Sequence, residues 1–151
     1  MDIEKYSDRV KGFIQSAQTQ ALSQGHQQFS PEHILKVLLD DSEGLASSLI
    51  EKAGGRPKDA LLGVEAALKA MPSVSGGGGQ LYMSQPLARV FDTAEKAAQK
   101  AGDSFVTVER LLLALAIEKS ASTSDLLSKA GVTANALNQA INDLRQGRTA
   151  D

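Results

Sequence analysis

Cysteine and tryptophan are absent from this chain of 151 residues, and aromatic residues make up only 4% of it. Without cysteine there is no disulfide framework, no thiolate metal site and no cysteine nucleophile. The longest apolar runs are only a few residues long, whereas a membrane-spanning helix needs about 20 predominantly apolar residues in a row. Because the first residues are also polar and unlike a secretory signal, the sequence predicts a cytoplasmic protein with no membrane partner.

An excess of charge of either sign is also lacking. The chain has 16 lysines and arginines against 18 aspartates and glutamates, which gives a formal net charge of −2. The two signs are interspersed, and no basic run occurs before the last few residues. A nucleic-acid surface usually combines a basic stripe with aromatic side chains for base stacking. The composition therefore argues against nucleic acid as a partner.

What the chain does contain is an internal repeat. Residues 49–54 return as residues 126–131, and the same offset aligns the rest of the two halves without a gap. Such a repeat indicates two copies of a small helical unit, each too small to bury its apolar face alone. Other positions that recur at this offset are Ala17, Ala21, Gly25, Glu32, Leu35 and Leu38, which return as Ala94, Ala98, Gly102, Glu109, Leu112 and Leu115.

Glycine and proline are concentrated between the two halves. Residues 72–80 contain a proline and, shortly after it, four consecutive glycines, a composition that ends a helix and favours a flexible connector. A glycine run can also form a phosphate-binding loop, but such a loop needs lysine and Ser or Thr at the start of a helix directly afterwards. Here Gln80-Leu81-Tyr82 follows instead, so we do not expect a nucleotide site.

Each half carries signals for four helices. The first is expected from Glu4 or Asp8 to Gln24, before Gly25, and its counterpart lies between residues 84 and 102. The second helix of each half, starting near residues 31 and 108, is almost continuously apolar, which predicts a central position. The third helices end at residues 53–54 and 130–131, and the fourth helices span residues 57–70 and 133–145. Strand signals are nearly absent, so the sequence predicts an all-α fold of two pseudo-twofold-related four-helix repeats forming one compact domain.

Catalytic and metal-binding constellations are hard to find. His26 and His33 are the only histidines, and we expect one in a loop and the other in a first helical turn, without a third metal ligand. Asp40 and Asp41 are adjacent, so they do not share a helix face as paired catalytic carboxylates would. We predict a non-catalytic domain with no catalytic, cofactor-binding or metal-binding residues.

The starts of the two central helices carry a shared motif. Residues 30–35 read Ser-Pro-Glu-His-Ile-Leu, residues 107–112 read Thr-Val-Glu-Arg-Leu-Leu, and both halves contain Lys-Ala-Gly. With the Gly-rich bridge, these features resemble the double Clp N-terminal repeat of the Clp AAA+ family, and residues 99–105 and 139–147 are most similar to its disaggregase branch. The resemblance covers essentially the whole chain. It implies one domain made of repeat 1 (residues 1–71), a connector (72–80), repeat 2 (81–147) and the start of a C-terminal linker (148–151).

The resemblance also implies a function. In this family the domain belongs to a hexameric, ATP-dependent chaperone that threads aggregated proteins through its pore in cooperation with the DnaK system. No GxxxxGK[ST] motif occurs in the chain, so ATP and magnesium are expected only in ATPase modules outside it. We expect the isolated domain to be a monomer, the parent protein a homohexamer, and the partners unfolded or aggregated client proteins.

Relatives in this family bind unfolded segments in an apolar groove with a polar rim. The resemblance implies a polar rim made of Ser7, Asp103 and Glu109. It implies an apolar lining that involves Phe91, Phe105 and the region around Val90. Arg110 departs from the family pattern, in which leucine can stand at this position, and its charge would favour acidic or polar segments. The implied substrate-binding residues are Ser7, Val90, Phe91, Asp103, Phe105, Glu109 and Arg110.

Each of these residues also has a purely structural explanation. Glu32 and Glu109 lie in first helical turns, where a carboxylate stabilises the helix by about 0.3–1 kcal/mol. Ser7 is suited to capping a helix, Asp103 to ordering a loop, and Phe91 continues an apolar helix stripe. As exposed rim residues, Asp103 and Glu109 should be replaceable by alanine with weaker client binding but nearly unchanged melting, because exposed charges contribute little to stability.

A second class of function stays open at this point. In the protease-associated Clp unfoldases that share this repeat, the domain docks folded adaptors or marked arginines. Glu32 and Glu109 occupy equivalent positions in the two repeats, and two equivalent carboxylates could each hold a cationic group. Adaptor docking or regulation is therefore the alternative to client binding.

Overall fold

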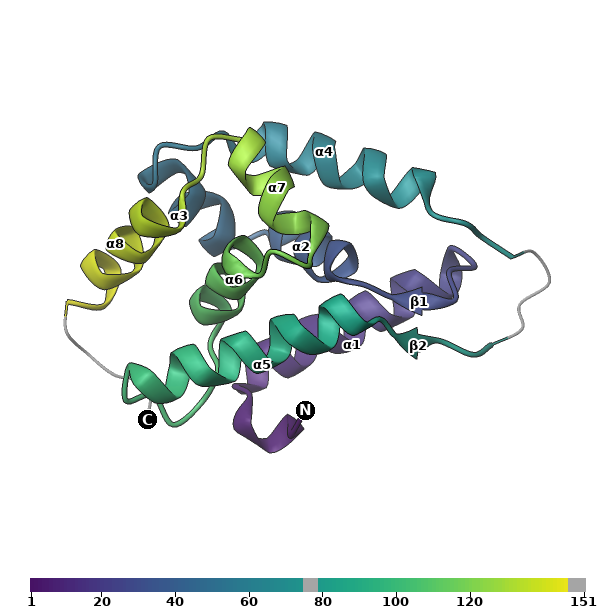
Figure 1. Ribbon diagram of the computed structural model, residues 1–151, viewed down its shortest axis with the longest axis horizontal. Helices are drawn as coiled ribbons and strands as arrows, with labels where there is room; N and C mark the ends of the chain where they lie inside the picture. Colours follow the sequence, from purple (N-terminus) through teal and green to yellow (C-terminus); the bar gives the residue numbers. More distant parts are fainter. Residues whose placement is uncertain (75–78, 147–151) are drawn as a thin grey trace.

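Eight α-helices dominate the computed structural model, which describes residues 1–74 and 79–146. A short 3-10 turn (Ile3–Lys5) precedes them, and two strands of two residues each, β1 (Gln28–Phe29) and β2 (Tyr82–Met83), also occur. In Figure 1, α1 and α5 lie along one side, α4 and α7 along the other, and α2 and α6 between them. The predicted all-α fold is confirmed. The helices are α1 (Asp8–Ser23), α2 (Pro31–Asp40), α3 (Leu45–Lys52), α4 (Pro57–Ala70), α5 (Gln85–Lys100), α6 (Val108–Ile117), α7 (Ser122–Lys129) and α8 (Ala134–Arg145).

The helix ends follow their capping residues. Ser84 Oγ accepts a hydrogen bond from the backbone N–H of Leu87 at 3.2 Å and so caps α5 as predicted. Gly25 and Gly102, which follow α1 and α5, have φ angles of 75° and 79°, a left-handed conformation that glycine adopts without steric cost. The first helix starts at the later of its two predicted positions, because residues 3–5 form a separate 3-10 turn. It ends at Ser23, one residue before the predicted Gln24, which is its C-cap.

The two central helices, α2 and α6, contact each other at the middle of the molecule. In each of them seven of the ten residues are buried, so neither helix has a broad solvent-facing side, as their continuous apolar sequences predicted. The buried apolar residues of both halves form a single cluster. Burial of this shared apolar surface is the main stabilising contribution to the fold.

In each half, the segment that precedes the first helix pairs with the main chain of the other half. Tyr6, before α1, forms a parallel bridge with Val106, after α5. Phe29, after α1, pairs with Met83, before α5, in the parallel β1–β2 pair. Met83 and Val106 are the repeat counterparts of Tyr6 and Phe29, so the two pairings are related by the pseudo-twofold symmetry. No sequence signal indicated these pairings, because two residues are too few for an alternating strand pattern.

Helices cross between the halves as well. Helix α3 packs against α6 and α8 of the second half, and α7 packs against α2 and α4 of the first. The beginning of the connector is fixed to the first half, because the N–H of Val74 donates to the carbonyl oxygen of Gly25 at 2.9 Å. Residues 75–78 of the predicted connector and residues 147–151, which include the predicted linker, lie outside the described residues.

Candidate functional site

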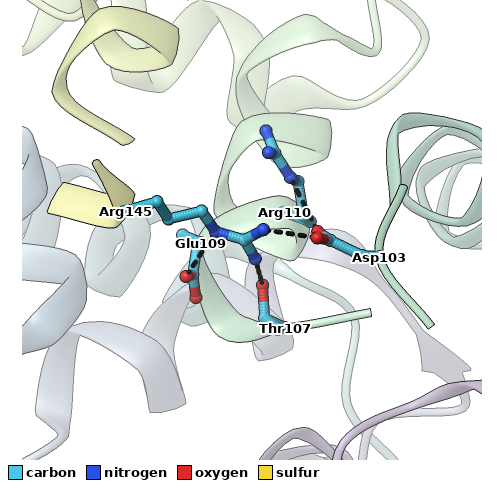
Figure 2. A network of polar contacts seen from close by, with 5 residues as sticks. All are labelled: Asp103, Thr107, Glu109, Arg110 and Arg145. Carbon is cyan, nitrogen blue, oxygen red and sulfur yellow. Dashed lines mark hydrogen bonds and ion pairs between the residues drawn. The ribbon is translucent and has the colours of Figure 1, made fainter. Parts of the chain in front are cut away.

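Asp103 is the centre of a buried network of charged side chains (Figure 2). It lies in the loop between α5 and α6, and its side chain is 0% exposed. One carboxylate oxygen accepts a hydrogen bond from Arg145 Nη1 at 2.5 Å, and the other accepts one from Arg110 Nε at 3.3 Å. Arg110 belongs to the first turn of α6, and Arg145 is the last residue of α8. The network therefore ties the loop to both helices.

Arg145 holds two further residues of this network. Its Nε donates to Glu109 Oε2 at 3.1 Å, and its Nη2 donates to Thr107 Oγ1 at 2.9 Å. Burial would lower the pKa of Arg145, but the hydrogen bond to Asp103 and the charge of Glu109 raise this pKa above its ordinary value. A buried charge is tolerated when it is paired and hydrogen-bonded in this way.

The polar residues predicted for the rim of a groove thus point into the protein. The side chains of Glu109 and Arg110 are 14% and 7% exposed, and Arg110 borders a separate hollow between α5, α6 and α8. Arg145, the common partner of Asp103 and Glu109, was not among the predicted residues. A signal for it exists in the repeat, because its counterpart in the first half is the buried Leu68. An arginine at a position where the other repeat has a buried leucine is expected to be buried too, and a buried arginine needs an acidic partner.

A surface hollow of about 550 Å³ lies beside this network. We call it the Phe105 hollow. Phe105 is 39% exposed at its edge. Charges of both signs surround it, and two of them form an ion pair, since Lys96 Nζ lies 2.9 Å from an oxygen of Asp92. The hollow is lined by Lys5, Asp92, Glu95, Lys96, Ala98, Gln99 and residues 102–106.

The other predicted groove residues lie beneath the surface or at a helix end. Val90 and Phe91 are 0% and 1% exposed, and the Phe91 ring meets Tyr6 edge to face with the ring centroids 5.7 Å apart. The Tyr6 hydroxyl donates to Glu95 at 2.5 Å, and Glu95 lines the hollow. Ser7 caps α1, because its Oγ accepts a backbone N–H of the first turn at 3.2 Å. Ser7, Val90 and Phe91 are thus not among the residues that line the hollow.

The first half carries a different pair at the positions of Asp103 and Arg110. Their counterparts, His26 and His33, are close together, with His26 Nδ1 2.7 Å from His33 Nε2. His33 Nδ1 accepts the backbone N–H of Ser30 at 3.0 Å, so in the neutral ring Nε2 carries the proton and donates to His26. Burial, with a smaller contribution from His26, lowers the pKa of His33 to about 4. The same contact between loop and helix is an ion pair in one half and a hydrogen bond between two histidines in the other.

Within residues 1–74 and 79–146, no group of three or more His, Cys, Asp or Glu side chains is arranged to hold a metal ion. Nor does any helix within this part of the chain have the length and apolar character needed to cross a membrane.

The arrangement of helices matches a known fold. The N-terminal domain of Hsp104 from Candida albicans superposes with a TM-score of 0.85 and 24% sequence identity, covering 97% of this chain and 95% of that one. The N-terminal domain of the ClpV1 ATPase from E. coli superposes with a TM-score of 0.76 and 18% identity, covering 99% and 90%. The sequence matches the Clp repeat (R) N-terminal domain over residues 5–130. The chain therefore belongs to the family of Clp N-terminal domains.

Within that family, several ClpB chaperones are similar to this chain over its whole length. Chaperone protein ClpB of Mesorhizobium japonicum is 74% identical over 151 residues, and that of Rhizobium meliloti is 69% identical over the same length. A more distant ClpB, from Meiothermus ruber, is 32% identical over 151 residues. Each match covers 100% of this chain and 17% of the relative. The chain is thus similar throughout to the N-terminal region of ClpB, which confirms the resemblance drawn from the sequence, and it contains no ATPase module.

Proposed function

We propose that this domain binds unfolded or aggregated segments of client proteins for a ClpB-type disaggregase and passes them to the ATPase ring. The parent protein would be a cytoplasmic homohexamer that works with the DnaK system and binds ATP and magnesium in modules outside this chain. The isolated domain is a monomer that binds clients without hydrolysing ATP. The observation that best supports this proposal is the Phe105 hollow, where an exposed aromatic side chain stands beside a recess.

Phe105 is the principal contact residue in this proposal. Burying an exposed phenylalanine contributes about 1.5–3 kcal/mol to association, and the contribution does not depend on the order of residues in the client. Charged groups of both signs around the hollow add no strong preference for one client charge. Such a site suits a protein that accepts many unrelated unfolded segments.

The remaining predicted residues act by positioning Phe105. Asp103 anchors the loop that carries Phe105, to α6 through Arg110 and to α8 through Arg145. Glu109 holds Arg145 in place. Ser7, Val90 and Phe91 support the hollow from the interior of the protein. Ser7 caps α1, and Val90 and Phe91 belong to the apolar core. A loop held in this way presents Phe105 without an ordering cost at the moment of binding.

Binding at such a site should be weak. Little apolar surface is available around one phenylalanine, and a client must afterwards be released to the ring. We expect a dissociation constant in the micromolar range or above, corresponding to a binding free energy of about −8 kcal/mol or weaker.

The Phe105→Ala variant tests the proposal. We expect its affinity for fluorescently labelled, unfolded casein to fall about tenfold, because the loss of part of one buried ring corresponds to about 1.4 kcal/mol. Leu62→Ala is the matched control, since Leu62 is 58% exposed on α4. Helix α4 lies on the opposite side of the molecule from α5 in Figure 1, and α5 contributes to the lining of the hollow. Both variants should keep the melting temperature of the parent chain. Unchanged casein affinity in Phe105→Ala would contradict the proposal.

Adaptor docking or regulation is the alternative function, and it relied on two equivalent carboxylates. In the structure Glu109 already accepts from the internal Arg145, whereas Glu32 accepts the hydroxyl of Ser122 at 2.8 Å. The two carboxylates are therefore not equivalent, which supports client binding over symmetric capture of cations. A titration with an arginine-phosphate peptide, followed by amide NMR, separates the two functions. Shifts confined to Glu32 and Glu109, with none near Phe105, would favour the alternative.

A further inference from the structure

A separate hollow, of about 400 Å³, lies between α5, α6 and α8. We call it the Arg110 hollow, because Arg110 of α6 lines it together with Lys100, the last residue of α5. No aspartate or glutamate is among the described residues that line it. The Phe105 hollow differs in this respect, since Asp92 and Glu95 contribute to its lining. The charged groups of the Arg110 hollow are therefore of one sign, which favours an anionic ligand.

Arg110 has hydrogen-bond donors left for such a ligand. Its side chain is 7% exposed, and its Nε donates to Asp103 at 3.3 Å. The Nη1 and Nη2 groups make no hydrogen bond within residues 1–74 and 79–146, and they lie on the far side of the guanidinium group from Asp103 (Figure 2). Every fully buried side-chain nitrogen in these ranges has a partner, so both Nη groups reach solvent in the hollow that Arg110 lines. This anchored side chain thus presents its unused donors at a fixed position.

Helix α8 adds a row of amide side chains to the hollow. Asn135, Asn138 and Asn142 recur at helical spacing, which places them on one face of α8, and all three line the hollow. Their side chains are exposed and form no hydrogen bond with any other described residue. An amide N–H donates to an oxyanion without adding a charge of its own. The wall opposite α5 therefore supplies neutral donors to a ligand that Arg110 attracts.

The first repeat shows how a cation is satisfied at the equivalent place. There Lys36 Nζ lies 2.6 Å from a carboxylate oxygen of Asp40 and 3.3 Å from one of Glu65. The repeat counterparts of these two acidic residues are Ile117 and Asn142, and both line the Arg110 hollow. The first repeat thus supplies carboxylates to its own cation, whereas the second has an apolar side chain and an amide at the same two positions.

We propose that the Arg110 hollow binds a carboxylate from an acidic segment of a partner protein, at the place where the first repeat uses its own carboxylates. The Nη groups of Arg110 donate to the carboxylate oxygens, Lys100 adds a second positive charge, and the amides of α8 donate to the remaining lone pairs. Ile117 is 39% exposed and lines the same hollow, so the ligand is an Asp or Glu next to an apolar residue. This site is separate from the Phe105 hollow and does not depend on the proposed client binding.

The charge available in the hollow fits a carboxylate better than a phosphate. Arg110 already shares its charge with the buried Asp103, so with Lys100 the hollow offers little more than a single uncompensated positive charge. One carboxylate balances that charge. A phosphorylated side chain carries about −1.5 to −2 and would remain partly unbalanced.

A pair of peptides tests the inference on the unaltered chain. The probe is a fluorescent 12-residue peptide of glycine and serine with two glutamates flanked by leucines at its centre. The control peptide has glutamine in place of both glutamates. We expect the glutamine peptide to bind about tenfold more weakly, because an uncharged amide loses the charge-assisted hydrogen bonds to Arg110. In NMR, the glutamate peptide should shift the side-chain amides of Asn138 and Asn142.

The Asn142→Asp variant tests the site from the protein side. It places a carboxylate where the first repeat has Glu65, so we expect it to repel the glutamate peptide and weaken its binding about fivefold. Gln85→Glu is the matched control, because it makes the same change from amide to carboxylate at an exposed position. Gln85 begins α5, about 20 Å along the helix from Lys100. The control should bind the glutamate peptide as the parent chain does, and both variants should melt within about 3 °C of it.

Equal affinity for the two peptides, or equal effects of Asn142→Asp and Gln85→Glu, would overturn the inference. The same holds if the glutamate peptide shifts Phe105 and leaves Asn138 unshifted, because the ligand would then lie in the proposed client site. Inorganic phosphate, titrated at constant ionic strength, is the last comparison. If phosphate shifts the amide of Asn138 and the glutamate peptide does not, the assignment to a carboxylate is wrong. None of these results alters the casein test of Phe105→Ala, so the two proposals stand or fall separately.

Discussion

At the scale of single residues, the carboxylate of Asp103 decides how the second repeat is assembled. Its side chain is 0% exposed and contacts two guanidinium groups, each on a different helix. Removing one partner from a buried ion pair leaves the other charge uncompensated, which usually costs more than the pair contributes when intact. Asp103 is therefore a structural residue in addition to any role in positioning Phe105.

We predict that Asp103→Ala lowers the free energy of unfolding by about 3–5 kcal/mol, because two buried arginines lose a shared partner. Urea denaturation followed by circular dichroism measures this change. Asp92→Ala is the control, since Asp92 is 63% exposed and pairs with the exposed Lys96, and its effect should stay within about 0.5 kcal/mol. If Asp103→Ala lowers the free energy of unfolding by less than about 1 kcal/mol, the buried role is contradicted and the exposed rim position predicted from the sequence is supported.

The histidine pair predicts a dependence of stability on pH. Since the pKa of His33 falls to about 4 in the folded state from about 6.5 in an unfolded chain, the unfolded state takes up the proton first on acidification. The stabilisation is complete above pH 6.5 and is lost as the pH falls towards 4, by about 2 kcal/mol between pH 7.5 and pH 5.

His33→Gln is the matched variant for this pH dependence, because glutamine does not titrate and can still accept the backbone N–H of Ser30 as in a capping box. Urea unfolding of both proteins at several pH values between 7.5 and 5 gives the two slopes. The His33→Gln slope should be clearly flatter than that of the parent chain. Parallel slopes would show that His33 does not carry the effect.

At the scale of elements, the connector packs closely on Gly25, the glycine that follows α1. A Cβ on Gly25 would lie 2.6 Å from the carbonyl oxygen of Val74, and the φ angle there is 75°. Gly12, in the middle of α1, has no atom within 4 Å of a built Cβ. The glycine within α1 and the glycine that follows it therefore differ in what an added methyl group would meet.

We predict opposite effects for alanine at these two positions. Gly25→Ala should destabilise the fold by about 1–3 kcal/mol, through strain in the left-handed backbone and displacement of the connector. Gly12→Ala should stabilise it by about 0.5–1 kcal/mol, because alanine is the better helix former. Thermal melting of both variants checks the signs. A neutral Gly25→Ala would mean that the connector leaves Gly25 easily.

The helices could be predicted from the sequence more fully than the contacts of the site. The starts at Ser84 and Pro31 and the buried character of α2 and α6 follow from neighbouring residues, which the sequence displays directly. The position of Phe91 in the core also follows from its helix stripe. The inward direction of Asp103 does not, because it depends on Arg145, which lies on a different helix far along the chain.

At the scale of the whole molecule, the segments that precede α1 and α5 each pair with the opposite half, which makes the two repeats interdependent. The backbone bridges Tyr6–Val106 and Phe29–Met83 both join one half to the other, and α3 and α7 pack on the opposite halves. Much of the apolar surface of each repeat is therefore covered by its partner. Each half by itself would expose this surface to water.

We predict that residues 1–74 and residues 79–146, prepared as separate chains, do not unfold cooperatively on their own. Mixed in equal amounts, they should regain helicity and a cooperative transition, because the missing apolar faces are then supplied in trans. Circular dichroism of each fragment and of the mixture is the measurement. A sharp melting transition in either fragment alone would show that one repeat is an independent folding unit.

The sequence by itself determined the positions of the helices, their caps, the repeat and the central place of α2 and α6, because these features depend on the spacing of nearby residues. Tertiary structure alone decided which side chains meet. Asp103 contacts Arg145, His26 contacts His33, and Val74 lies on Gly25. Each of these contacts joins different segments of the same half, so it depends on how those segments pack and not on the spacing of neighbouring residues. Equivalent positions of the two repeats therefore hold a histidine pair beside Gly25 in one half and an ionic network beside Phe105 in the other.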